Sequence, residues 1–286
     1  MVKVGIIGGS GLYHIEGIAN VKEITDIKTP FGMASDSLFA GQLDGIDVVF
    51  LSRHGRGHRV SPSEINYRAN IFMMKKLGVD AILSVSACGS LREDMKPLDF
   101  VVPDQFVDRT HQARKMTFFE NGIVAHVSLA DPVSPELTKI LVDSCKSLGL
   151  RVHPKGTYIN MEGPQFSTKA ESNLYRQWGM DIIGMTTMSE ARLAREAEIS
   201  YATLAAVTDY DCWHPGHDAV TVDMIIGYLT KNAENAKKIL KLAIPKIGQL
   251  KEFSAQGALK FALLTDRKAI PERVKKDLEI LIKNYL

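Results

Sequence analysis

The sequence predicts an α/β fold in which helices cover both faces of a central β-sheet. Short apolar runs bounded by glycine or polar residues recur along the chain, and amphipathic stretches with helix-capping signals separate them. Strands that alternate with helices in this way are typical of a sheet buried on both faces. The 286 residues contain no low-complexity linker and no internal repeat, so we expect a single domain over residues 1–286.

Several apolar runs have the length of buried strands. They cover residues 2–7, 46–51, 80–85, 100–102, 155–161, 181–184 and 199–207. Between the first two runs, residues 15–44 alternate short apolar and polar pieces around a Thr29-Pro30-Phe31-Gly32 turn. This pattern predicts hairpin-rich β-structure in that region.

Helices are expected where capping signals precede an apolar stripe. Ser61-Pro62-Ser63-Glu64 predicts a helix that ends at Gly78, because Ser suits the cap, Pro the first helical position and Glu a capping box. Thr168 and Glu171 predict a second capping box, for a helix that reaches Trp178. Further helices are expected over residues 134–149, from about 189 to 197, from about 221 to 244 and from 271 onward.

Composition and charge favour small-molecule chemistry. The chain is 45% hydrophobic and 24% charged, and its net charge of +2 comes from basic residues dispersed among acidic ones, so we expect neither a nucleic-acid nor a membrane partner. No signal-peptide pattern and no apolar run of ~20 residues is present, so a cytoplasmic location is expected. Cys88, Cys145 and Cys212 lie far apart without a CxxC pair, which predicts neither a disulfide framework nor a zinc site.

The first apolar run breaks into Gly8-Gly9-Ser10-Gly11, which predicts a turn whose backbone N–H groups cradle an anion. The segment lacks the Lys of a P-loop and does not match GxGxxG, so neither an ATP site nor a dinucleotide site is expected. A tight turn without a ligand is the alternative at this point.

Five of the predicted strands end in residues whose side chains could bind a ligand or take part in catalysis. They are Ser10, Arg53-His54, Ser86, Met185-Thr186 and Asp209-Tyr210-Asp211. Ligands of open α/β sheets bind beyond the carboxyl ends of the strands, so these loops are expected to meet. The first four supply a guanidinium, an imidazole and hydroxyls that suit a phosphate. The two carboxylates would repel phosphate and must face another part of the ligand. A metal, a shared proton, a nitrogenous base or a solvated turn all remain open for them.

Seven segments resemble the 5′-methylthioadenosine phosphorylases of the purine nucleoside phosphorylase superfamily. They are GIIGGSGL, LSRHGRGH with PSEINYRANI, SACGSLRED, DQFVDRT, MEGPQFSTKAES, MTTMSEARLARE and AVTDYDCW. The resemblance runs roughly from Lys3 to Ile244, and residues 267–286 have no counterpart in it, so they are expected to add a C-terminal amphipathic helix. It implies a central mixed β-sheet flanked by helices, assembly as a trimer or a dimer of trimers, and no metal or organic cofactor.

The reaction implied by the resemblance is phosphorolysis, in which inorganic phosphate displaces adenine from 5′-methylthioadenosine. The resemblance assigns the phosphate to Ser10, Arg53, His54, Ser86, Ala87 and Thr186. It places Met185 at the ribose, Phe166 beside the base, and Asp209 and Asp211 at the N7 and 6-amino edge of the purine. His126 is expected to reach the 5′-substituent of a neighbouring subunit's substrate. Asp209, His54 and Arg53 are the expected catalytic residues.

The chemistry agrees with this assignment, because cleavage of a ribosyl–purine bond leaves positive charge on the sugar and negative charge on the base. Phosphate stabilises the first and a proton on N7 stabilises the second. Asp209 can supply that proton only if burial and the nearby charge of Asp211 raise its pKa.

Three positions bear on the choice of substrate. Relatives that cleave 6-oxopurine nucleosides carry Glu and Asn where this chain has Ser167 and Asp209, which favours a 6-amino purine here. Val222 stands where those relatives hold the ribose 5′-hydroxyl with His, and its apolar side chain suits a methylthio group. The alternatives left open are a 6-oxopurine or methylthioinosine phosphorylase, a hydrolytic nucleosidase, and a nucleoside-binding protein without turnover.

Overall fold

The computed structural model describes the chain except for residues 10–11, 13–14, 26–27, 112–113 and 216–221, and the side chains of 222–226 are also left aside. The strands are β1 (Lys3–Gly8), β2 (Ala19–Ile24), β3 (Leu38–Leu43), β4 (Ile46–Ser52), β5 (Ala81–Ser90), β6 (Phe100–Val101), β7 (Gln105–Arg109), β8 (Val152–His153), β9 (Thr157–Met161), β10 (Ile182–Gly184) and β11 (Ser200–Asp209). The helices are α1 (Tyr67–Lys76), α2 (Pro135–Ser147), α3 (Lys169–Gln177), α4 (Thr187–Glu196), α5 (Val222–Ile247), α6 (Glu272–Asp277) and α7 (Glu279–Ile282).

One mixed sheet joins the strands, as expected from the sequence. Its main order is β2-β3-β4-β1-β5-β10-β9-β7, and β11 pairs with β5. The centre is parallel, since β1 pairs with β4 and β5, and β11 with β5, all in the same direction. β10 runs antiparallel to β5, which brings the residues after β10 back along the second half of β5. The carboxyl ends of β1, β4, β5 and β11 therefore open at the same edge of the sheet.

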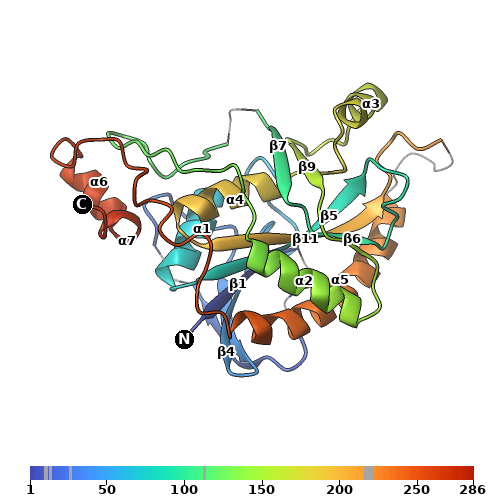
Figure 1. Ribbon diagram of the computed structural model, residues 1–286, viewed down its shortest axis with the longest axis horizontal. Coiled ribbons are helices and arrows are strands. Elements are labelled where there is room, and N and C mark those ends of the chain that lie inside the picture. The colour runs from blue at the N-terminus through green and yellow to red at the C-terminus, as the bar shows by residue number, and fades with distance from the viewer. Residues whose placement is uncertain (10–11, 13–14, 26–27, 112–113, 216–221) are drawn as a thin grey trace.

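Helices pack on both faces of this sheet (Figure 1). α1 and α4 share one apolar core with Tyr201 of β11. α2 and α5 share a second core with β1 and β5. Typical members of the first core are Ile71, Met74, Leu193 and Ile199, and of the second Leu137, Leu141, Ile239 and Leu240. Residues with apolar side chains at helical spacing thus form one buried stripe per helix.

The capping signals of the sequence are confirmed for one helix and wrong for another. Thr168 and Glu171 form the expected capping box at the start of α3. α1, however, begins at Tyr67, with Asn66 as its N-cap and Ala69 N donating to the Asn66 side chain. Ser61 and Glu64 form a turn of their own, closed by a 2.7 Å bond from Ser61 Oγ to the Glu64 carboxylate. The capping pair is satisfied locally and starts no helix.

The C-terminal segment differs from the single amphipathic helix expected after Pro271. It forms two short helices, α6 and α7, that meet at Leu278. Leu278, Leu281 and Ile282 are buried in the same core as α1. The expected apolar stripe therefore packs on this chain's own core.

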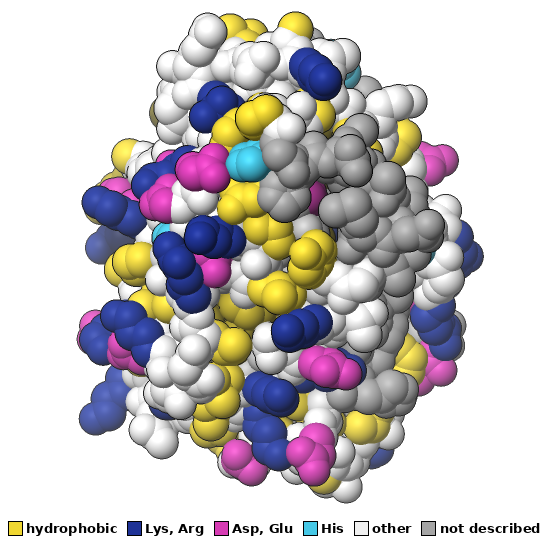
Figure 2. Space-filling model, turned by 90° about the vertical axis from the view of Figure 1, so that its right-hand side faces the viewer, with side chains coloured by type: hydrophobic (Ala, Val, Ile, Leu, Met, Phe, Trp, Pro, Cys, Tyr) yellow, Lys and Arg dark blue, Asp and Glu magenta, His cyan; other side chains and the backbone are white. Residues whose placement is uncertain are grey.

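The surface seen from the α3 end carries Lys and Arg side chains interspersed with acidic and hydrophobic ones (Figure 2). Among the described residues, none of the helices combines the length and the apolar character that crossing a membrane requires.

Candidate active site

The second half of β5 forms the floor of the candidate site. The strand is buried as far as Ser86, but Ala87 is exposed and Gly89 is partly exposed on the same face. Predicted site residues from three other segments lie along this stretch. Arg53 contacts it at Val85, Met185 and Thr186 follow β10 beside Ala87, and Asp209 pairs with Gly89. Val85 and Gly89 are about 13 Å apart at about 3.3 Å per residue, so a ligand that contacts both ends must extend along the strand.

Arg53 lies at one end of this floor in a buried ion pair. Its backbone N–H donates to Gly8 O at 2.9 Å, which places it at the end of β1. The guanidinium donates from Nε to Glu190 Oε1 at 2.5 Å and from Nη2 to Glu190 Oε2 at 3.0 Å, and it also donates to Ser84 Oγ and Val85 O. Burial alone would lower the pKa of Arg53, but the charge of Glu190 and the bonds to it outweigh this and raise the pKa. The guanidinium is thus fixed in orientation beside β5.

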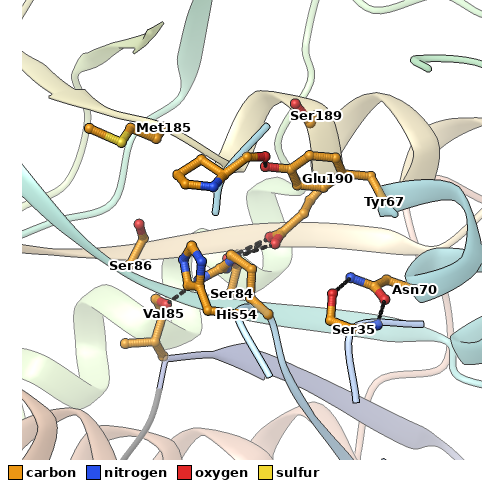
Figure 3. Close-up of polar contacts among 12 residues, drawn as sticks. Ser35, His54, Tyr67, Asn70, Ser84, Val85, Ser86, Met185, Ser189 and Glu190 are labelled. Carbon is orange, nitrogen blue, oxygen red and sulfur yellow. Dashed lines mark hydrogen bonds and ion pairs between the residues drawn. The ribbon is translucent and has the colours of Figure 1, made fainter. Parts of the chain in front are cut away.

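Glu190 has further hydrogen bonds that fix it in turn. Ser84 Oγ and Tyr201 OH donate to Glu190 Oε2 at 2.8 and 2.9 Å, and Thr203 Oγ1 donates to Tyr201 OH at 3.0 Å. Figure 3 shows Ser84 and Glu190 facing each other across this network. Since all of these groups are buried, the network holds one geometry.

His54 follows Arg53 and is half-buried. Its Nδ1 lies 2.8 Å from Val60 O, and because a carbonyl only accepts, Nδ1 carries the proton and Nε2 is the acceptor of the neutral ring. Burial and then the charge of Arg53 lower the pKa of His54 to about 4. The neutral ring can accept a hydrogen bond from a phosphate OH at Nε2, and a bound anion would raise its pKa again.

Thr186 and Met185 lie beside Ser86 and Ala87. The antiparallel register pairs Ile183 with Gly89, and a Cβ placed on Gly184 would lie 3.5 Å from Ala87 O. Thr186 is buried and is the N-cap of α4, so it lies at the N-terminus of that helix, where Met188 N donates to the Asn160 side chain. Figure 3 shows the side chains of Ser86, His54 and Met185 around one region. Hydroxyls, a helix N-terminus and a nearby guanidinium are together suited to hold a phosphate.

Asp209 and Asp211 lie at the other end. A Cβ on Gly89 would come within 2.9 Å of Asp209 Oδ1, so the lack of a side chain at Gly89 lets this carboxylate lie against β5. Asp209 accepts from Thr208 Oγ1 at 2.6 Å and from Asp211 N at 2.8 Å. Burial, and to a lesser degree the charge of Asp211, raises the pKa of Asp209, and burial also raises that of Asp211. This is the direction that proton donation by Asp209 requires.

The loop from Glu162 to Thr168 borders the same end. Cys212 Sγ donates to Ser167 O at 3.3 Å, which ties the loop to the segment after Asp211. Phe166 is exposed at 55% and its ring is free to contact a ligand. Gly163 packs so closely on Met185 that a Cβ there would lie 2.4 Å from Met185 Sδ.

Three predicted residues are not brought to this site by the described structure. Ser10 lies outside the described residues, and so does the side chain of Val222. His126 is exposed, and its backbone N–H donates to Ala262 O in a segment near the C-terminus. Within the described ranges, no group of three or more His, Cys, Asp or Glu side chains is arranged to hold a metal ion.

Sequence reasoning missed Glu190, Glu162 and Arg114. Glu190 and Glu162 belong to the segments singled out above and Arg114 does not, and the partners lie far apart in the sequence: Glu190 is 137 residues from Arg53 and Glu162 is 48 from Arg114. Their neighbours in the sequence include charged and polar residues as well as apolar ones, so no local signal marks them.

Comparisons with known proteins identify the family of the chain. A family model described as "Phosphorylase superfamily" matches residues 3–245. The chain is 52% identical over 283 residues to an S-methyl-5′-thioadenosine phosphorylase of Geobacter sulfurreducens, covering 99% of each chain. A methylthioadenosine phosphorylase from an antarctic soil metagenomic library is similar in structure, with a TM-score of 0.93, 51% identity and 98% of each chain covered. A variant of the adenosine/methylthioadenosine phosphorylase of Schistosoma mansoni in complex with methylthioadenosine has a TM-score of 0.80 and 35% identity, covering 99% of this chain and 98% of that one.

Proposed function

This chain belongs to the phosphorylase superfamily, and we infer that it catalyses the phosphorolysis of 5′-methylthioadenosine to adenine and 5-methylthioribose 1-phosphate. The observation that carries this function is the floor formed by β5, with anion-binding groups at one end and a carboxyl of raised pKa at the other. The enzyme is thus a pentosyltransferase with phosphate as the acceptor.

The bond changes follow from this arrangement. The C1′–N9 bond breaks with its electron pair moving to the base, and a phosphate oxygen forms a new bond to C1′. The charge on the base is neutralised by a proton on N7, and we assign this proton to Asp209, an assignment supported by the burial that raises the pKa of its carboxyl. Asp211, held by its backbone bond to Asp209, faces the 6-amino group as an acceptor.

For the phosphate end we propose Arg53, His54, Ser86, Ala87, Thr186 and Ser10 as the groups that bind inorganic phosphate. The N-cap position of Thr186, the fixed guanidinium of Arg53 and the acceptor nitrogen of His54 support this assignment. Phosphate and the proton of Asp209 supply the charges that the reaction needs, so no metal or organic cofactor is proposed.

The nucleoside is proposed to lie between Met185, Phe166 and Val222, with its base toward Asp209. Ser167 stands where relatives that cleave 6-oxopurine nucleosides carry Glu, and Asp211 is proposed to face the 6-position of the base. Both features favour adenine over a 6-oxopurine. Adenosine is proposed as a second substrate, since its base is the same. We also propose a cytoplasmic homo-oligomer, a trimer or a dimer of trimers, in which the exposed His126 reaches the 5′-substituent in a neighbouring subunit's site.

The test is a product assay with 5′-methylthioadenosine, adenosine and inosine side by side, each with and without phosphate. Adenine release from 5′-methylthioadenosine that requires phosphate, with little hypoxanthine from inosine, is the expected result. Equal release without phosphate indicates a hydrolase, faster hypoxanthine release indicates a 6-oxopurine phosphorylase, and binding without release indicates a non-catalytic protein.

A further inference from the structure

Arg114 is a buried arginine whose guanidinium hydrogen-bonds to three separate segments. Its side chain is 1% exposed. Nε donates to Glu162 Oε1 at 2.7 Å and an Nη2 hydrogen to Glu162 O at 2.7 Å. The Nη1 group donates to Met185 O at 2.6 Å, with Tyr67 OH and Ser189 Oγ each 3.2 Å away. A buried group that satisfies so many acceptors fixes the geometry of all of them.

The segments that Arg114 joins are those that border the sugar and base end of the site. Glu162 begins the loop that carries Phe166 and Ser167, and Met185 precedes α4. These two segments touch directly, because Gly163 packs against the Met185 side chain. Figure 3 shows Tyr67, Ser189 and Met185 on the α4 side of the region where Ser86 and His54 lie.

Tyr67 extends the same network to α1. Its hydroxyl accepts from Arg114 and donates to Pro62 O at 3.0 Å, and its ring lies under the guanidinium with a centroid distance of 5.5 Å. Glu162 also accepts from His111 N at 2.7 Å through its second oxygen. Both carboxylate oxygens of Glu162 therefore have hydrogen-bond partners, which fixes the start of the loop.

We propose that Arg114 is a positioning residue that sets the nucleoside half of the site by holding Met185 and the Glu162 loop at a fixed separation. The inference rests on the proposed function, since it assigns Met185 to the ribose. Arg114 does not contact the substrate: it acts through the Met185 carbonyl and the Glu162 backbone. The phosphate half has a further support, the Arg53–Glu190 ion pair, which does not include Arg114.

An arginine is needed here because its planar fork reaches acceptors in different directions at once. A lysine keeps the positive charge but offers its three hydrogens from one atom, so it cannot hold Glu162 and Met185 together. Arg114→Lys is therefore expected to loosen the separation of the two segments while it keeps the charge. Displacements of about 1 Å at a positioning residue can cost on the order of 100-fold.

The experiment measures steady-state kinetics of Arg114→Lys with 5′-methylthioadenosine and phosphate varied in turn. The KM for 5′-methylthioadenosine is expected to rise about tenfold or more, and the KM for phosphate to change less than about twofold. Glu162→Gln, which keeps the shape of the side chain and loses its charge, is expected to give a smaller change in the same direction. Arg68→Lys is the matched control, since Arg68 pairs with Glu120 and lies over Phe31, away from the site, and it should leave both constants unchanged.

The outcomes separate the inference from the function on which it rests. If the wild-type protein releases no adenine in a phosphate-dependent reaction, the proposed function is wrong, and calorimetric titration of 5′-methylthioadenosine into wild type and variant still tests Arg114. Equal loss of affinity for both substrates, or wild-type affinity for the nucleoside, overturns the inference. If thermal unfolding shows that Arg114→Lys does not fold, Glu162→Gln decides by the same KM comparison.

Discussion

Replacing Asp209 with Asn tests the base end of the site while leaving its local structure in place. Asp209 Oδ1 accepts from Asp211 N, and the Asn oxygen can keep that bond. In the wild-type protein, Thr208 Oγ1 donates to Asp209 Oδ2 at 2.6 Å and lies 3.2 Å from Cys88 O. In the variant, the same hydroxyl can donate to Cys88 O and accept from the Asn amide. The variant therefore loses the acidic proton and little else.

The size of the effect follows from that single loss. A positioned general acid is worth about 100- to 10,000-fold in rate. Since each factor of ten in rate is about 1.36 kcal/mol, the variant is expected to raise the barrier by about 3–5 kcal/mol. The KM for phosphate should stay within about twofold, because the proposed phosphate-binding residues of β5, Ser86 and Ala87, lie about 7–10 Å along the strand from Gly89, which pairs with Asp209.

The assay follows kcat with 5′-methylthioadenosine from pH 5 to pH 9 and repeats the comparison with inosine. Burial raises the pKa of Asp209, and a general acid must be protonated, so wild-type kcat should fall as pH rises past that pKa. The Asn variant should lack this fall and should shift its preference toward inosine. A loss of phosphate affinity as large as the loss of kcat, or an unchanged pH profile, would refute the assignment of Asp209.

Three further predictions concern the framework around the site. Glu190→Gln leaves Arg53 buried without its counter-charge, so urea unfolding should show a loss of about 3–5 kcal/mol, and added phosphate should recover more stability in the variant than in wild type. Burial raises the pKa of Glu196 from 4.5 to about 7 despite its bonds to Thr117 and Phe118, so the folded state binds the extra proton and stability falls as pH rises from about 4.5 to about 7. Glu196→Gln should remove about 3 kcal/mol of that fall, measured as the difference between variant and wild-type unfolding curves. Leu281→Ala should lower the free energy of unfolding by about 2–5 kcal/mol, because Leu281 is buried against the α1 core.

Each of these has a contradicting result. Equal stabilisation by phosphate in wild type and Glu190→Gln would show that Arg53 does not belong to the phosphate-binding site. Parallel pH–stability curves would show that Glu196 titrates normally. Wild-type stability in Leu281→Ala would mean that α7 does not belong to the folded core.

Local signals in the sequence predicted most of the framework. Apolar runs located the central strands, and the Thr168–Glu171 pair located the start of α3, because both signals act within a few residues. Ser61–Glu64 carried the same signal and was misleading, since nothing local reveals that Asn66 caps α1 instead. The short strands β7 and β8 were missed because their pairing with β9 and β6 comes from distant segments.

The candidate site was predicted as a set of strand ends, but the partners of those residues were not. Arg53 was expected to bind the phosphate, and no local pattern indicated that the fold pairs it with Glu190 from α4. His54 was expected at the phosphate without a defined tautomer, and only the contact with Val60 O defines one. Such contacts depend on tertiary packing, and a single sequence gives little direct information about which distant residues pack together.

The most direct test of one site with a phosphate end and a base end is ³¹P NMR of wild-type protein with 5′-methylthioadenosine and inorganic phosphate. The phosphate resonance is expected to decline while a sugar 1-phosphate resonance grows, with one adenine released for each ester formed. Adenine release with an unchanged phosphate resonance would contradict this expectation.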